Sequence, residues 1–283
     1  MKRIELLLIF IFLAVAVLLF FSLRYFDHPP SLMECFRISD SYYKHECITA
    51  VAAIKSDSSI CDFMSEPTFS FTQSPREECK DAVAEWRGYD ITPQLEDQEP
   101  HSGYTLEECA KEGLVRLAYR VEFPFYNDEI VISYAFAPGC EQLLQEQNES
   151  YCYREEISSA GEYKRNYTEE CVTSMRIAKG FGAEYACEEA SSIYPCYSKY
   201  ASVTHDKSVF GTERGFESYY ADFAIINNDK SACSLANGYN TSCLFYFALK
   251  ENDEVLCDGM ANEYVPHLCK AVILAQKEEE SGQ

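Results

Sequence analysis

Fourteen cysteines recur along this chain of 283 residues in two local settings. In the first setting an Asp stands four residues before the cysteine. In the second a Glu stands directly before it. This pattern is typical of a helical repeat held by disulfides outside the reducing cytosol. The Asp setting occurs at Cys61, Cys233 and Cys257, and the Glu setting at Cys47, Cys79, Cys109 and Cys171.

Both settings predict helix starts. The Asp is a natural N-cap, because its side chain accepts a backbone N–H and its charge suits the positive end of the helix dipole. The Glu-Cys pair opens a longer helix, on which an apolar residue follows the cysteine by four positions. Ser74 with Glu77 and Thr105 with Glu108 are predicted capping boxes. The apolar positions are Val51, Val83, Met175, Phe247 and Ile273.

The cysteine intervals favour disulfides between neighbouring helices, so we expect an all-α fold of disulfide-stapled helical-hairpin repeats. Sequence alone leaves other connectivities open, and the predicted pairing follows the repeat. It joins Cys35–Cys47, Cys61–Cys79, Cys140–Cys152, Cys187–Cys196, Cys233–Cys243 and Cys257–Cys269. The two remaining cysteines, both in the Glu setting, then form one long-range bridge, Cys109–Cys171.

Residues 4–23 form an apolar run broken only by Glu5 and Ser22. Twenty helical residues reach about 30 Å, the thickness of a bilayer's hydrocarbon core. No small-residue cleavage site follows the run, so residues 1–24 are predicted to be an uncleaved transmembrane signal anchor. Lys2 and Arg3 precede it, which favours a cytoplasmic N-terminus and an extracytoplasmic C-terminal domain in the cell membrane.

The start of the apolar run also resembles a type IV pilin, whose hydrophobic helix carries a Glu at the fifth mature position. Glu5 stands at that place, but only four residues precede it, so no pilin processing motif fits. A pilin-like subunit would also need the anchor helix to continue past residue 24 without the break at Pro29 and Pro30.

Composition shifts divide the remainder of the chain. We expect a stalk at 25–33, juxtamembrane helical repeats at 34–87, a linker at 88–104, the main helical-repeat ectodomain at 105–276 and a disordered tail at 277–283. Residues 121–136 fit either a β-hairpin or a helix interrupted by proline. We expect a helix, because the flanking segments are predicted to be helical.

Lys and Arg total 24 against 46 Asp and Glu, a net charge of −22. A chain this acidic is repelled by phosphate backbones, which argues against nucleic acid as a partner. The simplest interpretation of this charge is a soluble, self-repelling surface.

No motif indicates a reaction. Zinc sites and thioredoxin-type sites need cysteines two to four residues apart, and the closest pair, Cys187 and Cys196, has eight residues between them. The motifs of serine hydrolases and zinc proteases are absent. We therefore expect no catalytic residue, cofactor or metal. Possible glycosylation sites, which could instead be N-caps, are Asn148, Asn166 and Asn240.

The succession of an Asp-capped cysteine and a Glu-Cys helix covers most of residues 35–275. In this respect the chain resembles membrane-anchored, cysteine-rich helical-repeat proteins of the kind found in archaea, a resemblance that implies no catalytic residue. The leading hypothesis is an extracytoplasmic interaction or scaffold protein of the cell envelope with a protein or glycan partner. Its 21 tyrosines, clustered for example at Tyr194, Tyr197 and Tyr200, suit a binding surface. The competing hypothesis is a surface hydrolase acting on envelope polymers.

Overall fold

The computed structural model describes residues 28–65, 74–88, 90–96, 103–125, 128–157, 163–167, 169–211, 215–236 and 240–282. The predicted anchor at 4–23 lies outside these ranges. Within them, no helix combines the length and the apolar character needed to cross a membrane. The chain is mostly helical and divides into two compact units.

The first unit joins the two ends of the chain, with residues 1–88, 252–258 and 262–283. This unit includes the C-terminal segment, which the sequence pattern assigned to the main ectodomain, and residues 89–104 of the predicted linker fall in the other unit. The elements of this unit are α2 (Pro30–Arg37), α3 (Ser41–Ile54), η1 (Ser58–Phe63), α4 (Pro75–Glu85), most of η6 (Glu254–Gly259) and α12 (Val265–Gly282).

Helix α12 joins this unit because it packs against α2 and α3. Glu278 accepts hydrogen bonds from the Ser31 backbone N–H at 3.1 Å and from the Ser31 hydroxyl at 2.7 Å, and it pairs with Lys55 at 2.8 Å. Residues 277–282 are thus the last turns of a helix, and the prediction of a disordered tail is wrong there. Residues 30–33 of the predicted stalk are likewise helical, since Pro30 occupies the first position of α2.

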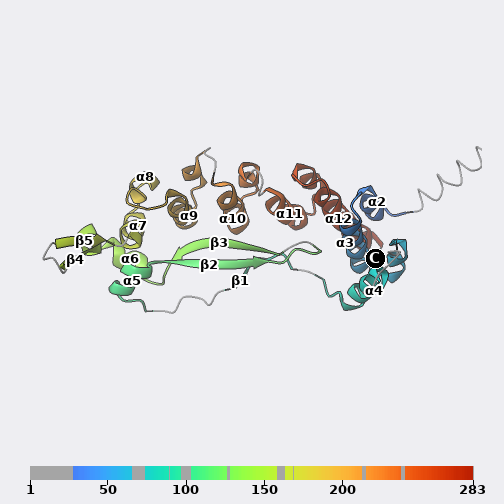
Figure 1. Cartoon of the computed structure of the whole chain (residues 1–283), viewed down its shortest axis with the longest axis horizontal. Helices are drawn as coiled ribbons and strands as arrows, with labels where there is room; N and C mark the ends of the chain where they lie inside the picture. Colours follow the sequence, from blue (N-terminus) through green and yellow to red (C-terminus); the bar gives the residue numbers. More distant parts are fainter. Residues whose placement is uncertain are drawn as a thin grey trace, which may run out of the picture. The chain divides into compact units, whose positions relative to one another are not determined.

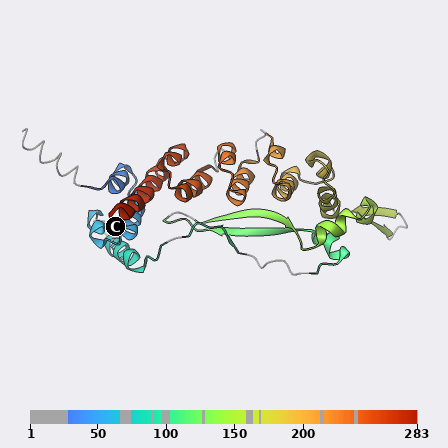
Figure 2. The same ribbon diagram turned by 180° about the vertical axis from the view of Figure 1, so that it is seen from behind.

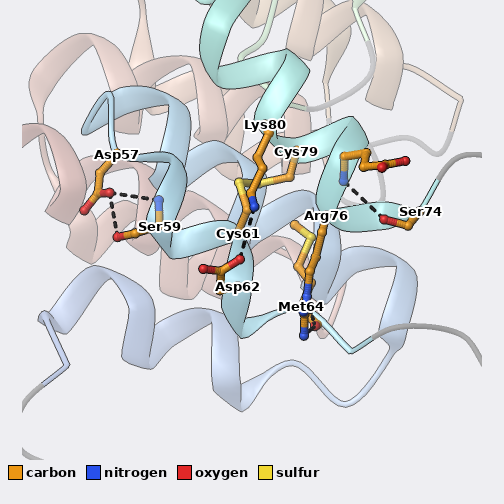
Figure 3. The surroundings of a disulfide bond; sticks show 10 residues. Asp57, Ser59, Cys61, Asp62, Met64, Ser74, Arg76, Cys79 and Lys80 are labelled. Atoms are coloured by element: carbon orange, nitrogen blue, oxygen red, sulfur yellow. Dashed lines mark hydrogen bonds and ion pairs between the residues drawn. A yellow bond between two sulfur atoms is a disulfide. The ribbon is translucent and has the colours of Figure 1, made fainter.

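The disulfide Cys61–Cys79 joins η1 to α4, with its sulfurs 2.07 Å apart (Figure 3). The predicted cap is present, because Asp57 accepts a hydrogen bond from the Ser59 N–H at 2.9 Å. The element that follows is a 3-10 helix of six residues. At the start of α4, Ser74 accepts from the Glu77 N–H at 3.4 Å, which is one half of the predicted capping box.

The second unit comprises residues 89–251 and 259–261. Its first half holds β1 (Gln94–Leu95), α5 (Leu106–Glu112), β2 (Leu114–Val121), β3 (Glu129–Phe136), α6 (Cys140–Gln145), η2 (Glu149–Cys152), β4 (Tyr153–Ile157) and β5 (Tyr163–Tyr167). Its second half holds α7 (Glu169–Ala178), α8 (Ala183–Ala186), α9 (Ile193–Thr204), η3 (Lys207–Phe210), α10 (Glu217–Asn227), η4 (Lys230–Leu235) and α11 (Asn240–Glu251).

Residues 114–136 form an antiparallel β-hairpin, which corrects the expected all-α fold and the helix expected at 121–136. Strands β2 and β3 pair from Leu114 opposite Phe136 to Val121 opposite Glu129, and β1 adds a third strand from within the predicted linker. Arg116, Ala118 and Arg120 alternate with the larger apolar side chains Val115, Leu117, Tyr119 and Val121, which is the two-residue period of a strand. A second antiparallel pair joins β4 to β5.

Helices α9 and α10 lie side by side against β3, as both views show (Figures 1 and 2). Strand β3 is an edge strand, because β2 separates it from β1. An uncovered edge presents unpaired backbone N–H and C=O groups that invite pairing with other chains. The two helices cover this edge within the unit.

All fourteen cysteines form disulfides, and none is free. Five predicted pairs are confirmed: Cys35–Cys47, Cys61–Cys79, Cys187–Cys196, Cys233–Cys243 and Cys257–Cys269. In each pair the Cα atoms lie 5.4–5.8 Å apart.

Two predicted pairs are wrong: the structure forms Cys109–Cys140 and Cys152–Cys171 in place of Cys109–Cys171 and Cys140–Cys152. The reason is the two hairpins. Strands β2 and β3 leave α5 and return to α6, which brings Cys109 and Cys140 to a Cα distance of 5.2 Å. Strands β4 and β5 do the same for Cys152 and Cys171, at 5.5 Å. All four half-cystines then share one buried cluster.

The predicted apolar positions behave as expected on four of the five helices. Val51, Met175, Phe247 and Ile273 are buried, whereas Val83 on α4 is half-buried. The capping box at Thr105 is complete, since the Glu108 N–H donates to Thr105 and the Glu108 carboxylate accepts from the Thr105 N–H at 2.7 Å. Local sequence chemistry therefore sets the helix starts and their buried faces.

Candidate functional site

The same backbone turn occurs four times in the described residues. A residue in the left-handed region, at φ 51–57°, ends a helix, and an Asp follows it. The Asp carboxylate accepts a hydrogen bond from the N–H two residues later and starts a 3-10 helix. The four pairs are Ser56-Asp57, His205-Asp206, Asn228-Asp229 and Asn252-Asp253.

At two of these four turns the Asp acts on both helices. Its backbone N–H closes the preceding helix, as Asp57 does to the Ala52 carbonyl at 2.9 Å and Asp229 to the Ala224 carbonyl at 2.8 Å. These are the hydrogen bonds of a Schellman motif, which requires a left-handed residue just before the Asp. Its side chain caps the next turn. One residue thus ends one helix and begins another.

The turn at Asp206 lacks the cysteine of the other three. Phe210 takes the position four residues after the Asp, where Cys233 stands after Asp229. The second cysteine of that repeat, Cys243, comes ten residues after the first, and Tyr220 comes ten residues after Phe210. An aromatic pair therefore replaces the disulfide in this repeat.

A solvent-open groove of about 770 Å³ lies at this cysteine-free repeat. Residues from α8, the start of α9, η3 and the segment before α10 line it. Its larger apolar side chains are Tyr185, Ile193, Tyr197, Phe210 and Phe216, and its polar lining includes Glu184 and Ser208. A volume of several hundred Å³ is within the range of ligand sites.

Aromatic rings form a continuous cluster along one side of the groove. The ring of Phe216 stacks on Tyr197 with centroids 5.9 Å apart and meets Tyr194 edge to face at 4.7 Å. Phe210 lies 5.4 Å from Phe216 and 4.9 Å from Tyr220. The Tyr220 hydroxyl donates to the Gly211 carbonyl at 2.5 Å and so holds the end of η3 in place.

Large apolar side chains are exposed around the groove. Four of them lie within fourteen residues of sequence, and each is between 37% and 46% exposed: Phe181, Tyr185, Ile193 and Tyr194. Single exposed apolar residues are common on soluble proteins, but a contiguous group of them marks a surface that binds something.

One wall of the groove is fixed by a buried arginine. Arg176 on α7 pairs with the Glu149 carboxylate at 3.2 and 3.3 Å and donates to the Tyr185 carbonyl at 2.7 Å. Its guanidinium also lies 4.0 Å from the centroid of the Tyr185 ring. Hydrogen bonds to Glu149 favour the charged guanidinium and keep the pKa of Arg176 raised despite burial. Tyr185 is therefore held from one side while 43% of it remains exposed.

Two glycines shape the groove in different ways. Gly215 has φ +113°, and a Cβ there would come within 2.8 Å of the Tyr194 ring, so only glycine fits without a shift. Gly182 lines the groove with φ −65°, and a Cβ there would meet no atom within 4 Å. Gly182 thus leaves space that a side chain could fill without strain.

The predicted glycosylation sites lie in different environments. Asn148 is exposed, and its side-chain oxygen accepts a hydrogen bond from the Ser150 N–H at 3.1 Å. Asn240 is half-buried, and its amide donates to the Gly259 carbonyl at 3.1 Å. The side chain of Asn166 lies outside the described residues. Neither Asn148 nor Asn240 lines the groove.

A carboxylate outside the groove, that of Asp222, lies on α10 beside the edge of the hairpin. It accepts a hydrogen bond from the Ile132 backbone N–H, and Glu129 and Arg116 lie nearby. Burial, with repulsion from Glu129, raises the pKa of Asp222 to about 7, although the Ile132 N–H and Arg116 act in the opposite direction. This contact caps an otherwise unpaired group of the edge strand β3.

Sequence reasoning pointed to Tyr194 and Tyr197 as part of a possible binding surface, and the structure places both rings against Phe216. Phe210 and Phe216 fall outside a repeat pattern that is defined by cysteines. The signal that identifies them is the Asp206 turn with an aromatic residue at the cysteine position. Among the described residues, no group of three or more His, Cys, Asp or Glu is placed to hold a metal ion.

Comparisons with protein-family models, curated proteins and solved structures found no match. Function is therefore inferred from the geometry and chemistry of the groove.

Proposed function

We propose that this chain is a single-pass, membrane-anchored interaction protein that binds an extracytoplasmic partner through the groove beside η3. The observation that carries the proposal is the open aromatic groove at the one turn of the Asp series whose cysteine is replaced. Departures from an otherwise consistent pattern tend to occur where function competes with stability.

The proposed location depends on the N-terminal segment and the cysteines. Residues 4–23 have the length of a membrane span, and Lys2 and Arg3 favour a cytoplasmic N-terminus. Seven disulfides suit an oxidising compartment on the far side of the membrane.

The lining of the groove favours binding over catalysis. Glu184 is the one carboxylate among its described lining residues, whereas glycoside hydrolysis usually requires a pair. Aromatic side chains contribute large contact areas with little loss of conformational freedom, which is why Tyr and Trp dominate protein interfaces. A rigid aromatic wall next to exposed apolar residues suits a partner that inserts side chains.

Site-specific photo-crosslinking in intact cells tests the proposal. A benzoylphenylalanine in place of Ile193, which is 46% exposed in the groove, should form an adduct with the partner. The same probe in place of Val255, 69% exposed in the first unit, is the matched control and should form none.

A second change shows whether the adduct depends on the groove. Gly182→Leu should abolish it by narrowing the groove, while Gly182→Ser, a small residue favoured at this N-cap position, should retain it. An adduct that forms equally from position 255, or that survives Gly182→Leu, would contradict the proposal.

The proposed orientation in the membrane has its own test. Protease added outside spheroplasts should remove the ectodomain and leave an N-terminal tag protected.

A further inference from the structure

We propose that the groove binds the Lys or Arg side chains of a basic, extended polypeptide segment. This inference rests on the proposed function and adds the chemical class of the partner. It follows from two features of the groove, its aromatic rings and its carboxylate, together with the strongly acidic charge of the whole chain.

The groove offers what a cationic side chain needs. Its described lining contains the exposed ring of Tyr185, the half-buried ring of Tyr197 and the carboxylate of Glu184, but no Lys, Arg or His. Phe210 and Phe216 also line it but are each only 2% exposed, so they support the tyrosines rather than contact a ligand. A cation over an aromatic face gains electrostatic energy from the ring, and a nearby carboxylate adds an ion pair. The apolar stem of a Lys or Arg would lie along Ile193.

Three described cations, on α7, α9 and η3, are already paired with other carboxylates. Lys199 pairs with Glu170, Lys207 with Asp229 at 2.5 Å, and Arg176 with Glu149 at 3.2 Å. Glu184, by contrast, is exposed and forms no ion pair with any described residue. The groove therefore retains a carboxylate that a partner can use.

The molecule itself shows that this wall accepts a guanidinium. One side of the Tyr185 ring holds Arg176, with 4.0 Å from the guanidinium carbon to the ring centroid. Tyr185 as a whole residue remains 43% exposed and lines the groove, so a second cation can approach it from there. The same ring chemistry would then serve on both sides of Tyr185.

The net charge favours the same class of partner over others. A charge of −22 attracts polycations and repels phosphate and carboxylate polymers, at rates that depend on salt. A neutral glycan would gain the aromatic contacts but nothing from Glu184 or from the overall charge. A basic polypeptide uses all three features.

Fluorescence anisotropy with the full-length protein in zwitterionic lipid nanodiscs tests this inference. The probe is a fluorescein-labelled dodecapeptide with four repeats of Gly-Leu-Arg, and its control replaces every Arg with citrulline, which has the same shape without the charge. We expect the citrulline peptide to bind at least tenfold more weakly, and empty nanodiscs to bind neither peptide.

Variants locate the binding. Glu184→Gln should raise the dissociation constant of the Arg peptide three- to tenfold, and Gly182→Leu at least tenfold. Glu141 is an exposed carboxylate on α6 outside the groove lining. Glu141→Gln removes the same charge and should change the dissociation constant of the Arg peptide less than twofold. None of these substitutions involves a cysteine, and far-ultraviolet circular dichroism and Tm serve as folding controls.

Equal binding of the citrulline and Arg peptides, or equal effects of Glu184→Gln and Glu141→Gln, would overturn the inference. So would the absence of any peptide binding. In each of these cases the photo-crosslink from position 193 tests the proposed function separately. If the adduct is still lost in Gly182→Leu, the groove is a binding site for a partner of another class.

Discussion

The rings of Phe210 and Tyr220 meet edge to face with their centroids 4.9 Å apart, ten residues from each other in the chain. Cys233 and Cys243 hold the equivalent positions in the next repeat and form a disulfide with the same separation. The aromatic pair therefore fills the place of a covalent bridge. Like the disulfides, the pair is buried, with Phe210 2% and Tyr220 5% exposed, and Phe210 also lines the groove.

The equivalence predicts that the double variant Phe210→Cys, Tyr220→Cys forms an eighth disulfide. Peptide mapping without reductant should find the two segments linked. We expect no net gain in stability, because a loop of this size contributes about 3 kcal/mol, while the loss of a buried Phe costs roughly 3–5 kcal/mol. Free thiols at both positions would show that the repeats are not equivalent in space. Phe210→Ser, Tyr220→Ser is the control without sulfur.

The hairpins predict which cysteines are joined in the central cluster. Mapping of the native protein should link the peptide of Cys109 to that of Cys140, at a sequence separation of 31. Replacing both with Ser should lower the free energy of unfolding by about 4 kcal/mol in the chain-entropy model. Urea titration measures this loss. A peptide linking Cys109 to Cys171 would contradict the structure.

Asp222 predicts a pH dependence of stability. Its ordinary pKa of 3.8 applies in the unfolded chain and its raised pKa, about 7, in the folded protein. Between these values the folded state binds the proton that the unfolded state releases, so stability falls as pH rises, by up to about 1.4 kcal/mol per pH unit.

The variant Asp222→Asn isolates this effect, because it keeps an oxygen that can accept from the Ile132 N–H. We expect its Tm to exceed that of the wild type at pH 7.5 and to match it near pH 4. Glu129 and Arg116 remain in place as the neighbouring charges. An equal difference in Tm at both pH values would show that Asp222 does not titrate in this range.

Replacement by Ala is expected to lower the stability of the protein at Gly215 but not at Gly182. Gly215→Ala should lower the free energy of unfolding by about 1–2 kcal/mol, because φ is +113° and the new Cβ would meet the Tyr194 ring at 2.8 Å. Gly182→Ala should stay within about 0.5 kcal/mol of wild type, since its φ is ordinary and the space is open. Thermal unfolding of the two variants compares them directly. Equal losses would contradict the groove geometry.

Several features of the fold were readable from short stretches of sequence. The Asp57 and Asp229 caps, the Thr105 capping box and the five disulfides between neighbouring cysteines all involve residues that are close in the chain. Their energetics depend on local hydrogen bonds and short loops. The cysteine pattern alone therefore indicated a mostly helical, disulfide-stapled protein.

The errors in the all-α fold and in the two cysteine pairs have one physical cause. Strand pairing joins residues that lie far apart, and the alternation in 114–121 acquires its meaning only when a partner strand and covering helices are present. Once the hairpins form, they place Cys109 beside Cys140 and Cys152 beside Cys171, which no interval rule contains. The groove arises in the same way, because rings from α9, η3 and the segment before α10 meet only after packing. The local sequence determines the helix caps and the disulfides between neighbouring cysteines. Contacts between distant segments determine the strand pairing, the pairs Cys109–Cys140 and Cys152–Cys171, and the groove.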